Sequence, residues 1–184
     1  QGASPATGGQ IDPDVVAVLD DPSDEVFERF GEHAHSAESA EAVHLLATRV
    51  VDEEWTASVT ARGDVALTVR IDDAHQASLE RVGEVVTARI IIGPVDHVLG
   101  MRTDLDEDAE LSITAIPFGG IPGQRKGPDR LVLGADGGGG FVELASFDSR
   151  YISTEVAGGF TGRVVGVEAL GGNAVVTRFA YSPS

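Results

Sequence analysis

Hydrophobic residues recur at every second position through much of this chain, and this period constrains its fold more than any other feature. In segments 43–48, 55–60 and 65–70, apolar side chains alternate with polar or small ones. Successive side chains of a β-strand point to opposite faces, so each segment is expected to bury one face and expose the other. The three segments therefore predict half-buried strands of a sheet that covers a core.

Further segments have the length and composition of strands, and turn-forming residues separate them. These segments are 76–81, 84–92, 95–100, 109–116, 129–135, 140–146, 162–169 and 174–181. Turns are predicted at Arg62-Gly63-Asp64, at Gly93-Pro94, from Pro117 to Pro128 and from Asp136 to Gly140. About eleven short strands with regular turns and almost no helical pattern predict the all-β class, as an antiparallel β-sandwich.

The remaining sequence predicts one domain behind a flexible lead-in. Residues 1–14 are rich in Gly, Pro, Ser and Ala, so residues 1–19 are assigned to the lead-in and residues 20–184 to the sandwich domain. A capped turn or a short helix is predicted within residues 20–30. At 184 residues the chain is long enough to bury one sizeable core. The aromatic residues expected in or near that core are Trp55, Phe141, Phe147 and Phe179.

A net charge of -17 limits the partners that this chain can bind. The charge comes from 30 acidic and 13 basic residues. Phosphate backbones and anionic membranes attract clustered cations, so neither nucleic acid nor a membrane is an expected partner. No apolar run approaches the roughly 18 residues of a membrane-spanning helix. Without cysteine the chain has no disulfide and no thiolate metal site, and its location, cytoplasmic or secreted, stays open.

A glycine-flanked aromatic residue, Phe160, carries a more specific pattern. Glycines surround it within residues 157–162, and an alternating strand follows. The segments that share the wider pattern are Leu45 to Val50, Val65 to His75, Gly139 to Leu144 and Asp148 to Val167. Together they resemble the C-terminal β-sandwich domain of glycoside hydrolase family 43 (GH43) β-xylosidases. The resemblance extends over residues 40–181 and is most specific over residues 139–170.

The resemblance implies a concanavalin A-like β-sandwich of the jelly-roll type, with two antiparallel sheets packed face to face. It also implies an accessory role, because the catalytic carboxylates of these enzymes lie on a separate propeller domain that is larger than this chain. The sandwich packs on that propeller, and an aromatic residue from one of its loops reaches toward the substrate pocket. Phe160 matches that aromatic. The implied partners are the catalytic propeller, a second copy of the chain, or xylo- and arabino-oligosaccharides.

Candidate ligand-binding residues lie in the same part of the sequence. Sugar-binding sandwiches stack apolar sugar faces on exposed aromatic rings, and Tyr151 and Phe160 are the best loop-borne candidates. Arg150 lies next to Tyr151 and offers a fork of donors to hydroxyls or carboxylates. The alternative interpretation is that both aromatic rings pack the end of the sandwich.

The segment Asp104-Leu105-Asp106-Glu107-Asp108 is a candidate structural calcium site. Its alternating carboxylates at Asp104, Asp106 and Asp108 are the ligand type that calcium prefers. The segment lacks the glycine and the glutamate spacing of an EF-hand loop, since Glu110 comes too soon. No other cofactor is expected from the sequence.

Three functions remain open at this point. The first is a non-catalytic module associated with the degradation of xylan or arabinan. The second is a stand-alone, lectin-like sandwich that binds a glycan or a protein. The third is a sandwich-fold glycanase, which needs two carboxylates facing each other across a cleft. The acidic groups at 52–54, 72–73 and 104–110 all lie in turn-like stretches, where solvated carboxylates are the ordinary finding.

Overall fold

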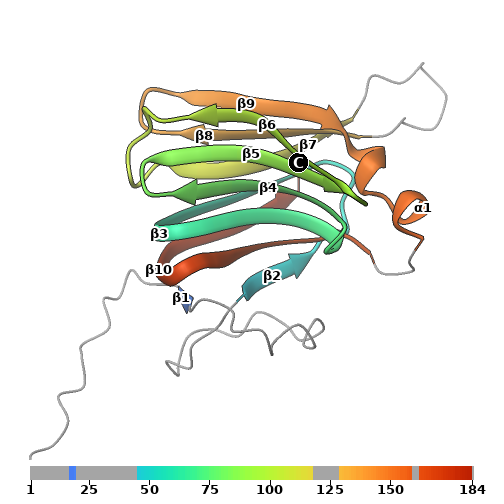
Figure 1. The fold of residues 1–184 in the computed structure, drawn as a ribbon, viewed down its shortest axis with the longest axis horizontal. Helices are drawn as coiled ribbons and strands as arrows, with labels where there is room; N and C mark the ends of the chain where they lie inside the picture. Colours follow the sequence, from blue (N-terminus) through green and yellow to red (C-terminus); the bar gives the residue numbers. More distant parts are fainter. Residues whose placement is uncertain (1–16, 20–44, 118–128, 159–161, 184) are drawn as a thin grey trace, which may run out of the picture.

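In the computed structural model of this chain, residues 17–19, 45–117, 129–158 and 162–183 are described. They form an antiparallel β structure with two short helical turns (Figure 1). The strands are β1 (Ala17–Leu19), β2 (Leu45–Arg49), β3 (Trp55–Asp72), β4 (His75–Val82), β5 (Val85–Ile92), β6 (Val95–Arg102), β7 (Glu110–Pro117), β8 (Asp129–Asp136), β9 (Phe141–Asp148) and β10 (Val164–Pro183). The 3-10 helix η1 (Ser149–Ile152) and the α-helix α1 (Thr154–Ala157) follow β9.

The strands form two layers, because β3 and β10 are long and each contributes to both. Residues 65–72 of β3 pair with β4, whereas residues 55–59 pair with β7. Layer 1 therefore runs β6-β5-β4-β3-β10-β2, and layer 2 runs β9-β8-β7-β3-β10-β1. These pairings are antiparallel, so the prediction of an all-β antiparallel sandwich is confirmed.

One prediction about strand boundaries was wrong. Arg62-Gly63-Asp64 was expected to be a turn between two strands, but the hydrogen bonding of β3 continues through it as a bend. Gly63 has a φ of 91°, which glycine adopts without steric cost, and the register with β10 shifts nearby. The segments predicted at 162–169 and 174–181 are likewise one strand, β10, because it follows β3 around the corner.

The core lies between the two layers and follows the predicted alternation. The largest fully buried side chains are Trp55, Leu67, Leu79, Leu111, Ile113, Leu131, Leu133, Ile152, Val59, Val65 and Val69. Phe147 and Phe179 pack against this core, as expected. The expectation for Phe141 was wrong, since its side chain is 51% exposed. Phe141 pairs with Asp136 on the outward row of layer 2, so the pleat turns it away from the core.

The N-terminal predictions fall largely outside the described residues. Residues 17–19 form β1 and pair with residues 174–176 of β10. The capped turn or short helix predicted within residues 20–30 and the first sixteen residues of the lead-in are not among those described. In the part of the chain that is described, no helix has the length and apolarity that crossing a lipid bilayer requires.

Candidate functional site

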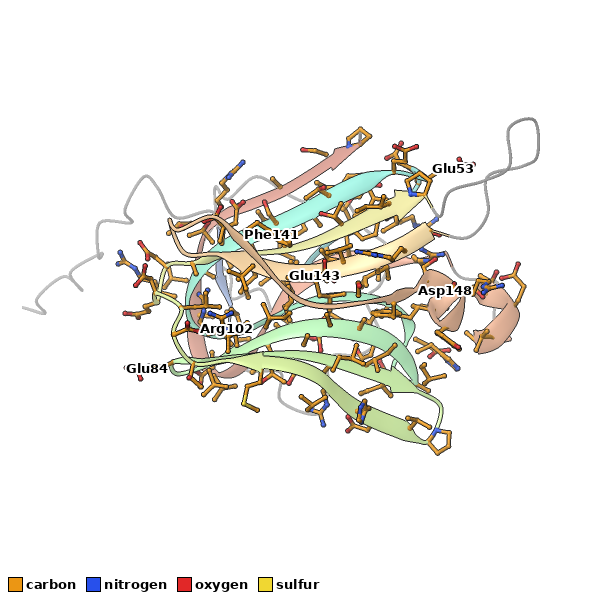
Figure 2. All side chains as sticks on the ribbon, turned by 90° about the horizontal axis from the view of Figure 1, so that it is seen from above. Glu53, Glu84, Arg102, Phe141, Glu143 and Asp148 are labelled. Atoms are coloured by element: carbon orange, nitrogen blue, oxygen red, sulfur yellow. The ribbon has the colours of Figure 1, made fainter. Side chains whose placement is uncertain are left out.

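The two ends of the sandwich differ in structure, and each holds a cavity. The helical end carries η1, α1 and the strand termini at Val50, Pro117, Asp129 and Arg163, whereas the acidic end carries the β3 bend and residues 103–107. Figure 2 shows Glu53 and Asp148 at the helical end, and Glu84 and Arg102 at the acidic end. The sequence pattern that resembled a known family, residues 139–170, passes through the helical end, where it forms η1 and α1.

The cavity at the helical end has a volume of about 390 Å³. Segments that are far apart in the sequence meet around it. Its lining is Val50, Val51, Asp52, Glu53, Ile71, Pro117, Asp129, Ser153, Thr154, Glu155 and Arg163. One part of the wall is apolar, and the rest carries carboxylates and one guanidinium. The cavity therefore has the mixed character of a site for a polar ligand or a partner.

Asp129 and Arg163 of this wall form a hydrogen-bonded network with Ser149, which does not itself line the cavity. Arg163 Nη1 donates to Asp129 Oδ2 at 2.7 Å, and Ser149 Oγ donates to Asp129 Oδ1 at 2.5 Å. Arg163 Nη2 also donates to Ser149 Oγ at 3.3 Å. Burial by itself would raise the pKa of Asp129, but the hydrogen bonds from Arg163 and Ser149 outweigh it and lower that pKa. The carboxylate is therefore ionised at neutral pH and fixed in position.

The short helices that follow β9 place Ser149 of the network and Ser153 of the cavity wall. Asp148 accepts a hydrogen bond from the backbone N–H of Arg150 at 2.9 Å and so caps η1, while Ile152 is buried and anchors it. Helix α1 then ends at Gly158, whose φ of 69° is the left-handed conformation of a helix C-terminus. The pKa of the Glu155 carboxyl is lowered by hydrogen bonds from its own backbone N–H and from Ser153. Glu155 is therefore a second ionised carboxylate in the lining of this cavity.

A tyrosine braces the opposite side of the same end. Tyr181 stacks on the buried Trp55 with ring centroids 5.8 Å apart, and its hydroxyl donates to Asp52 Oδ2 at 2.9 Å. Burial, reinforced by the hydrogen bond to Asp52, raises the pKa of Tyr181, so the hydroxyl keeps its proton as a donor. Asp52 lines the cavity, and its orientation is thus connected to the core through two aromatic rings.

The structure places two of the three predicted site residues at this end and leaves the third untested. Tyr151 is 53% exposed on η1, and the Arg150 side chain is 70% exposed and hydrogen-bonded to Asp148, with Nε to Oδ2 at 2.9 Å. Neither residue lines the cavity. Phe160 lies outside the described residues. Tyr151 and Arg150 thus remain candidates for a surface beside the cavity.

Sequence reasoning missed the network of Asp129, Ser149 and Arg163. Asp129 and Ser149 begin β8 and η1, and Arg163 precedes β10, so no spacing in the sequence connects them. A weak signal did exist, because Asp129 and Arg163 each follow a stretch of sequence that is rich in Gly or Pro. Their association depends on the order of strands in the two layers, which local periodicity does not determine.

The acidic end holds the residues predicted to bind calcium. Its cavity, of about 610 Å³, is lined by Gly63, Asp64, Arg81, Gly83, Glu84, Thr103, Asp104, Leu105, Asp106 and Glu107. Asp104 is hydrogen-bonded to Arg102, with Nε to Oδ1 at 2.7 Å. Among the described residues, no three His, Cys, Asp or Glu side chains converge as ligands for a metal ion. The structure therefore does not bring Asp104, Asp106 and Asp108 together as a calcium site.

Arg81 occupies the inner wall of that cavity and is only 2% exposed. Its guanidinium donates to two backbone carbonyls, that of Ala61 at 2.8 Å and that of Ala109. Burial lowers the pKa of Arg81, and the nearby carboxylates of Asp108 and Glu107 oppose that effect. Arg81 thus connects β4 with the bend of β3 and with the residue before β7.

Comparisons with known proteins identify the fold. No protein-family model matches the chain, and no curated protein matches it. Among solved structures, the Bacteroides ovatus xyloglucan PUL GH43B matches with a TM-score of 0.62 and 21% identity. The GH43 protein BlXynB of Bacillus licheniformis matches with a TM-score of 0.55 and 17% identity. A bifunctional GH43-CE protein of Bacteroides eggerthii matches with a TM-score of 0.54 and 11% identity.

These matches cover most of this chain and a minor part of each neighbour. The shares of this chain are 76%, 75% and 84%, and the corresponding shares of the neighbours are 29%, 29% and 20%. The chain therefore has the fold of one portion of these GH43 proteins. This finding confirms, at the level of fold, the resemblance that residues 139–170 first indicated.

Proposed function

We propose that this chain is a non-catalytic β-sandwich module that works beside a GH43 catalytic domain in the degradation of xylan- or arabinan-type polysaccharides. The observation that carries the proposal is the coverage of the structural matches. The chain corresponds to 20% to 31% of several GH43 proteins, which is the relation expected between an accessory domain and a multidomain enzyme.

The electrostatics of the helical end support a non-catalytic role. A glycosidase needs one carboxyl group whose pKa is raised, so that it can protonate the leaving oxygen. Asp129 and Glu155 line the cavity, and the pKa of each is shifted downward instead. Asp129 is moreover held by Arg163 and Ser149, which leaves its oxygens occupied. This arrangement suits a rigid contact surface better than proton transfer.

In the proposed arrangement the helical end faces the catalytic domain. Tyr151 and Arg150 are exposed beside the cavity, and Phe160 lies in the segment between α1 and β10. An aromatic side chain from this segment would complete the wall of the neighbouring substrate pocket. The network of Asp129, Ser149 and Arg163 would hold both ends of that segment in place, because Ser149 precedes it and Arg163 follows it.

The test begins with the isolated chain and with the coding sequence on either side of it. We expect no release of sugar from 4-nitrophenyl β-xyloside, 4-nitrophenyl α-arabinofuranoside, xylan or arabinan by the chain alone. We also expect a GH43 propeller in the same reading frame or in an adjacent gene. That propeller should be less active, or less stable to heat, when the sandwich is omitted.

Matched variants locate the contact. Phe160→Ala and Tyr151→Ala should reduce the activity of the combined protein, whereas Met101→Ala, on β6, should not. Sugar release by the isolated chain would refute the non-catalytic role. The association would be refuted if neither the reading frame nor an adjacent gene encoded a propeller. It would also be refuted if omitting the sandwich changed neither the activity nor the heat stability of that propeller.

A further inference from the structure

The exposed aromatic ring of Phe141 lies away from the helical end, on the outward face of layer 2. Figure 2 shows Phe141, Glu143 and Asp148 in order along β9, with Phe141 toward the acidic end. Phe141 pairs with Asp136 and Glu143 pairs with Gly134, so both side chains lie on the outward row. A phenylalanine that is 51% exposed at the start of a strand calls for a cause, because Phe147 on the same strand is partly buried and packs against the core.

Gly134 on the neighbouring strand β8 provides the seat for this ring. A Cβ atom added to Gly134 would lie 2.3 Å from Phe141 Cζ and 2.5 Å from Phe141 Cε2. The ring therefore rests directly on the backbone of β8, in space that any other residue would fill. Covering a glycine in this way is a known device of β-sheets and holds the aromatic in one orientation. The side of the ring that faces away from Gly134 accounts for its exposure.

Hydroxyl groups line the floor beside the ring. Ser112 on β7 pairs with Gly134, and Ser58 on β3 pairs with Ser112, so one row of the outward face carries small residues. Ser58 is buried, at 7% exposure, so Ser112 is the hydroxyl of this row that a ligand can reach. The next row contains Thr56 and Thr114, whose hydroxyl oxygens lie 3.1 Å apart. Because these side chains are small, the ring of Phe141 projects beyond them at one edge of the outward face.

Charged groups beside the ring occur as pairs of opposite sign. Arg178 Nη1 donates to Glu110 Oε2 at 2.6 Å, and Arg130 Nη2 donates to Glu143 Oε2 at 3.4 Å. Glu110 pairs in register with Asp136, the partner of Phe141. The surface therefore offers both donors and acceptors of hydrogen bonds, and the guanidinium groups offset the glutamates with which they pair.

We propose that the outward face of layer 2, centred on Phe141 and Gly134, binds a neutral glycan. The C–H face of a sugar ring is apolar and packs on an aromatic ring, whose face carries partial negative charge. The surrounding hydroxyls, glutamates and arginines match the alternating hydroxyl groups of such a ligand. An acidic glycan would meet the charge of -17 and the carboxylate of Asp136, and a cation would meet Arg130 and Arg178.

This site is separate from the proposed docking end. Phe141 lies at the β8–β9 turn, whereas η1, α1 and the cavity of the helical end lie where β9 finishes. Glycan binding at Phe141 therefore does not depend on the association with a catalytic domain. An isolated chain that binds glycan through Phe141 would support this inference even if no propeller partner existed.

Affinity gel electrophoresis of the chain tests the inference with soluble arabinoxylan, arabinan, xyloglucan and polygalacturonate as probes. We expect retardation by at least one of the three neutral polymers and none by polygalacturonate. Phe141→Ala should weaken binding about tenfold or more, because truncating a central aromatic contact removes a large share of binding energy. Phe141→Trp should retain binding, since it keeps an aromatic face.

Two further variants separate a ligand platform from a purely structural aromatic. Phe141→Leu should weaken binding while largely keeping the cover over Gly134. Gly134→Ala should weaken binding and also lower the thermal midpoint, because its methyl group would collide with both the ring and the backbone carbonyl of Val142. Val95→Ala, which removes a side chain that is 55% exposed at the far end of β6, should leave binding unchanged. Three outcomes would overturn the inference. The first is equal retardation of Phe141→Ala and the unaltered chain. The others are retardation by none of the neutral polymers, and retardation by polygalacturonate equal to that by the neutral polymers.

Discussion

The two ends of the sandwich both contain arginine among carboxylates, but they use it differently. At the helical end Arg163 donates to Asp129 and Ser149, and the three groups form a closed polar network in a cavity wall. At the acidic end Arg81 is buried deeper and donates to the backbone carbonyls of Ala61 and Ala109. The first arrangement fixes side chains around a cavity, whereas the second fixes backbone where strands change layer.

The difference teaches that charge density does not indicate function in this protein. The acidic end has more carboxylates, yet several of them have structural tasks. Asp64 accepts a hydrogen bond from Gly83 N at 2.9 Å and joins the β3 bend to the β4–β5 turn. Asp136 accepts one from Gly138 N at 2.8 Å within the β8–β9 turn. Carboxylates line a cavity at each end, so their number alone does not distinguish the two ends.

The largest effect is expected from Arg81→Met, which breaks the acidic end. The carbonyls of Ala61 and Ala109 would lose their donor while remaining inside the fold. Leaving buried polar groups unsatisfied costs about 1–3 kcal/mol each, so we expect a loss of about 3 kcal/mol in the free energy of unfolding. Urea denaturation measures it. Arg102→Met is the matched control at the same end and should leave the midpoint unchanged; similar losses from both variants would contradict the role of Arg81.

A smaller effect is expected from Asp129→Ala, which breaks the helical end. Arg163 and Ser149 would lose their shared acceptor, and a partly buried, charge-assisted hydrogen bond contributes about 1–2 kcal/mol. Thermal denaturation should show this loss, and Asp129→Asn should recover part of it by keeping an acceptor oxygen. If Asp129→Ala lowers the free energy of unfolding as much as Arg81→Met does, the Asp129 network stabilises the fold as strongly as Arg81 does. The proposed difference between the two ends would then be wrong.

Acid titration sharpens the same comparison. The pKa of Asp129 is lower in the folded chain than its ordinary value near 3.9, so the folded state binds this proton less readily than the unfolded state. Its contribution to stability is complete above that ordinary value and is lost as the pH falls through the folded pKa. Asp129→Asn should therefore flatten the dependence of unfolding free energy on pH below about 4. An unchanged slope would show that Arg163 does not stabilise the carboxylate.

The smallest effect is expected from Tyr181→Phe. This variant keeps the stack on Trp55 and removes the donor to Asp52, so the loss should be about 0.5–1 kcal/mol. Denaturation in urea at neutral pH checks the value. Tyr181→Ala should cost considerably more, because it also removes the stacked ring. Equal losses from the two variants would show that the hydroxyl, and not the ring, braces this end.

The period-two pattern predicted most of the strands, because burial of one face leaves a local trace in the sequence. Trp55, Leu67 and Val69 lie in the core for that reason. The pattern did not show that β3 and β10 bend and continue, since a bend at Arg62-Gly63-Asp64 and a turn share the same residues. The assignment of Phe141 to the core also failed, because alternation alone does not say which of two faces is inward.

The candidate site was less predictable than the fold. Tyr151 and Arg150 were found because they are near a distinctive glycine loop in the sequence. Asp129 and Arg163 are 34 residues apart and meet only through the order of the strands. The calcium prediction relied on the spacing of Asp104, Asp106 and Asp108, but the ion pair between Arg102 and Asp104 gives one of these carboxylates another partner. Ligand type alone did not determine geometry.

The sharing of β3 and β10 between the layers has a consequence for synthesis of the protein on the ribosome. β10 pairs with β1, β2 and β3, and its residues 174–183 lie in layer 2 while residues 164–169 lie in layer 1. Layer 1 cannot close until residue 169 has left the exit tunnel, and layer 2 cannot close until residue 183 has left it. The earlier hairpins must therefore wait with their apolar faces open to water, so chaperone binding should be greatest just before β10 emerges.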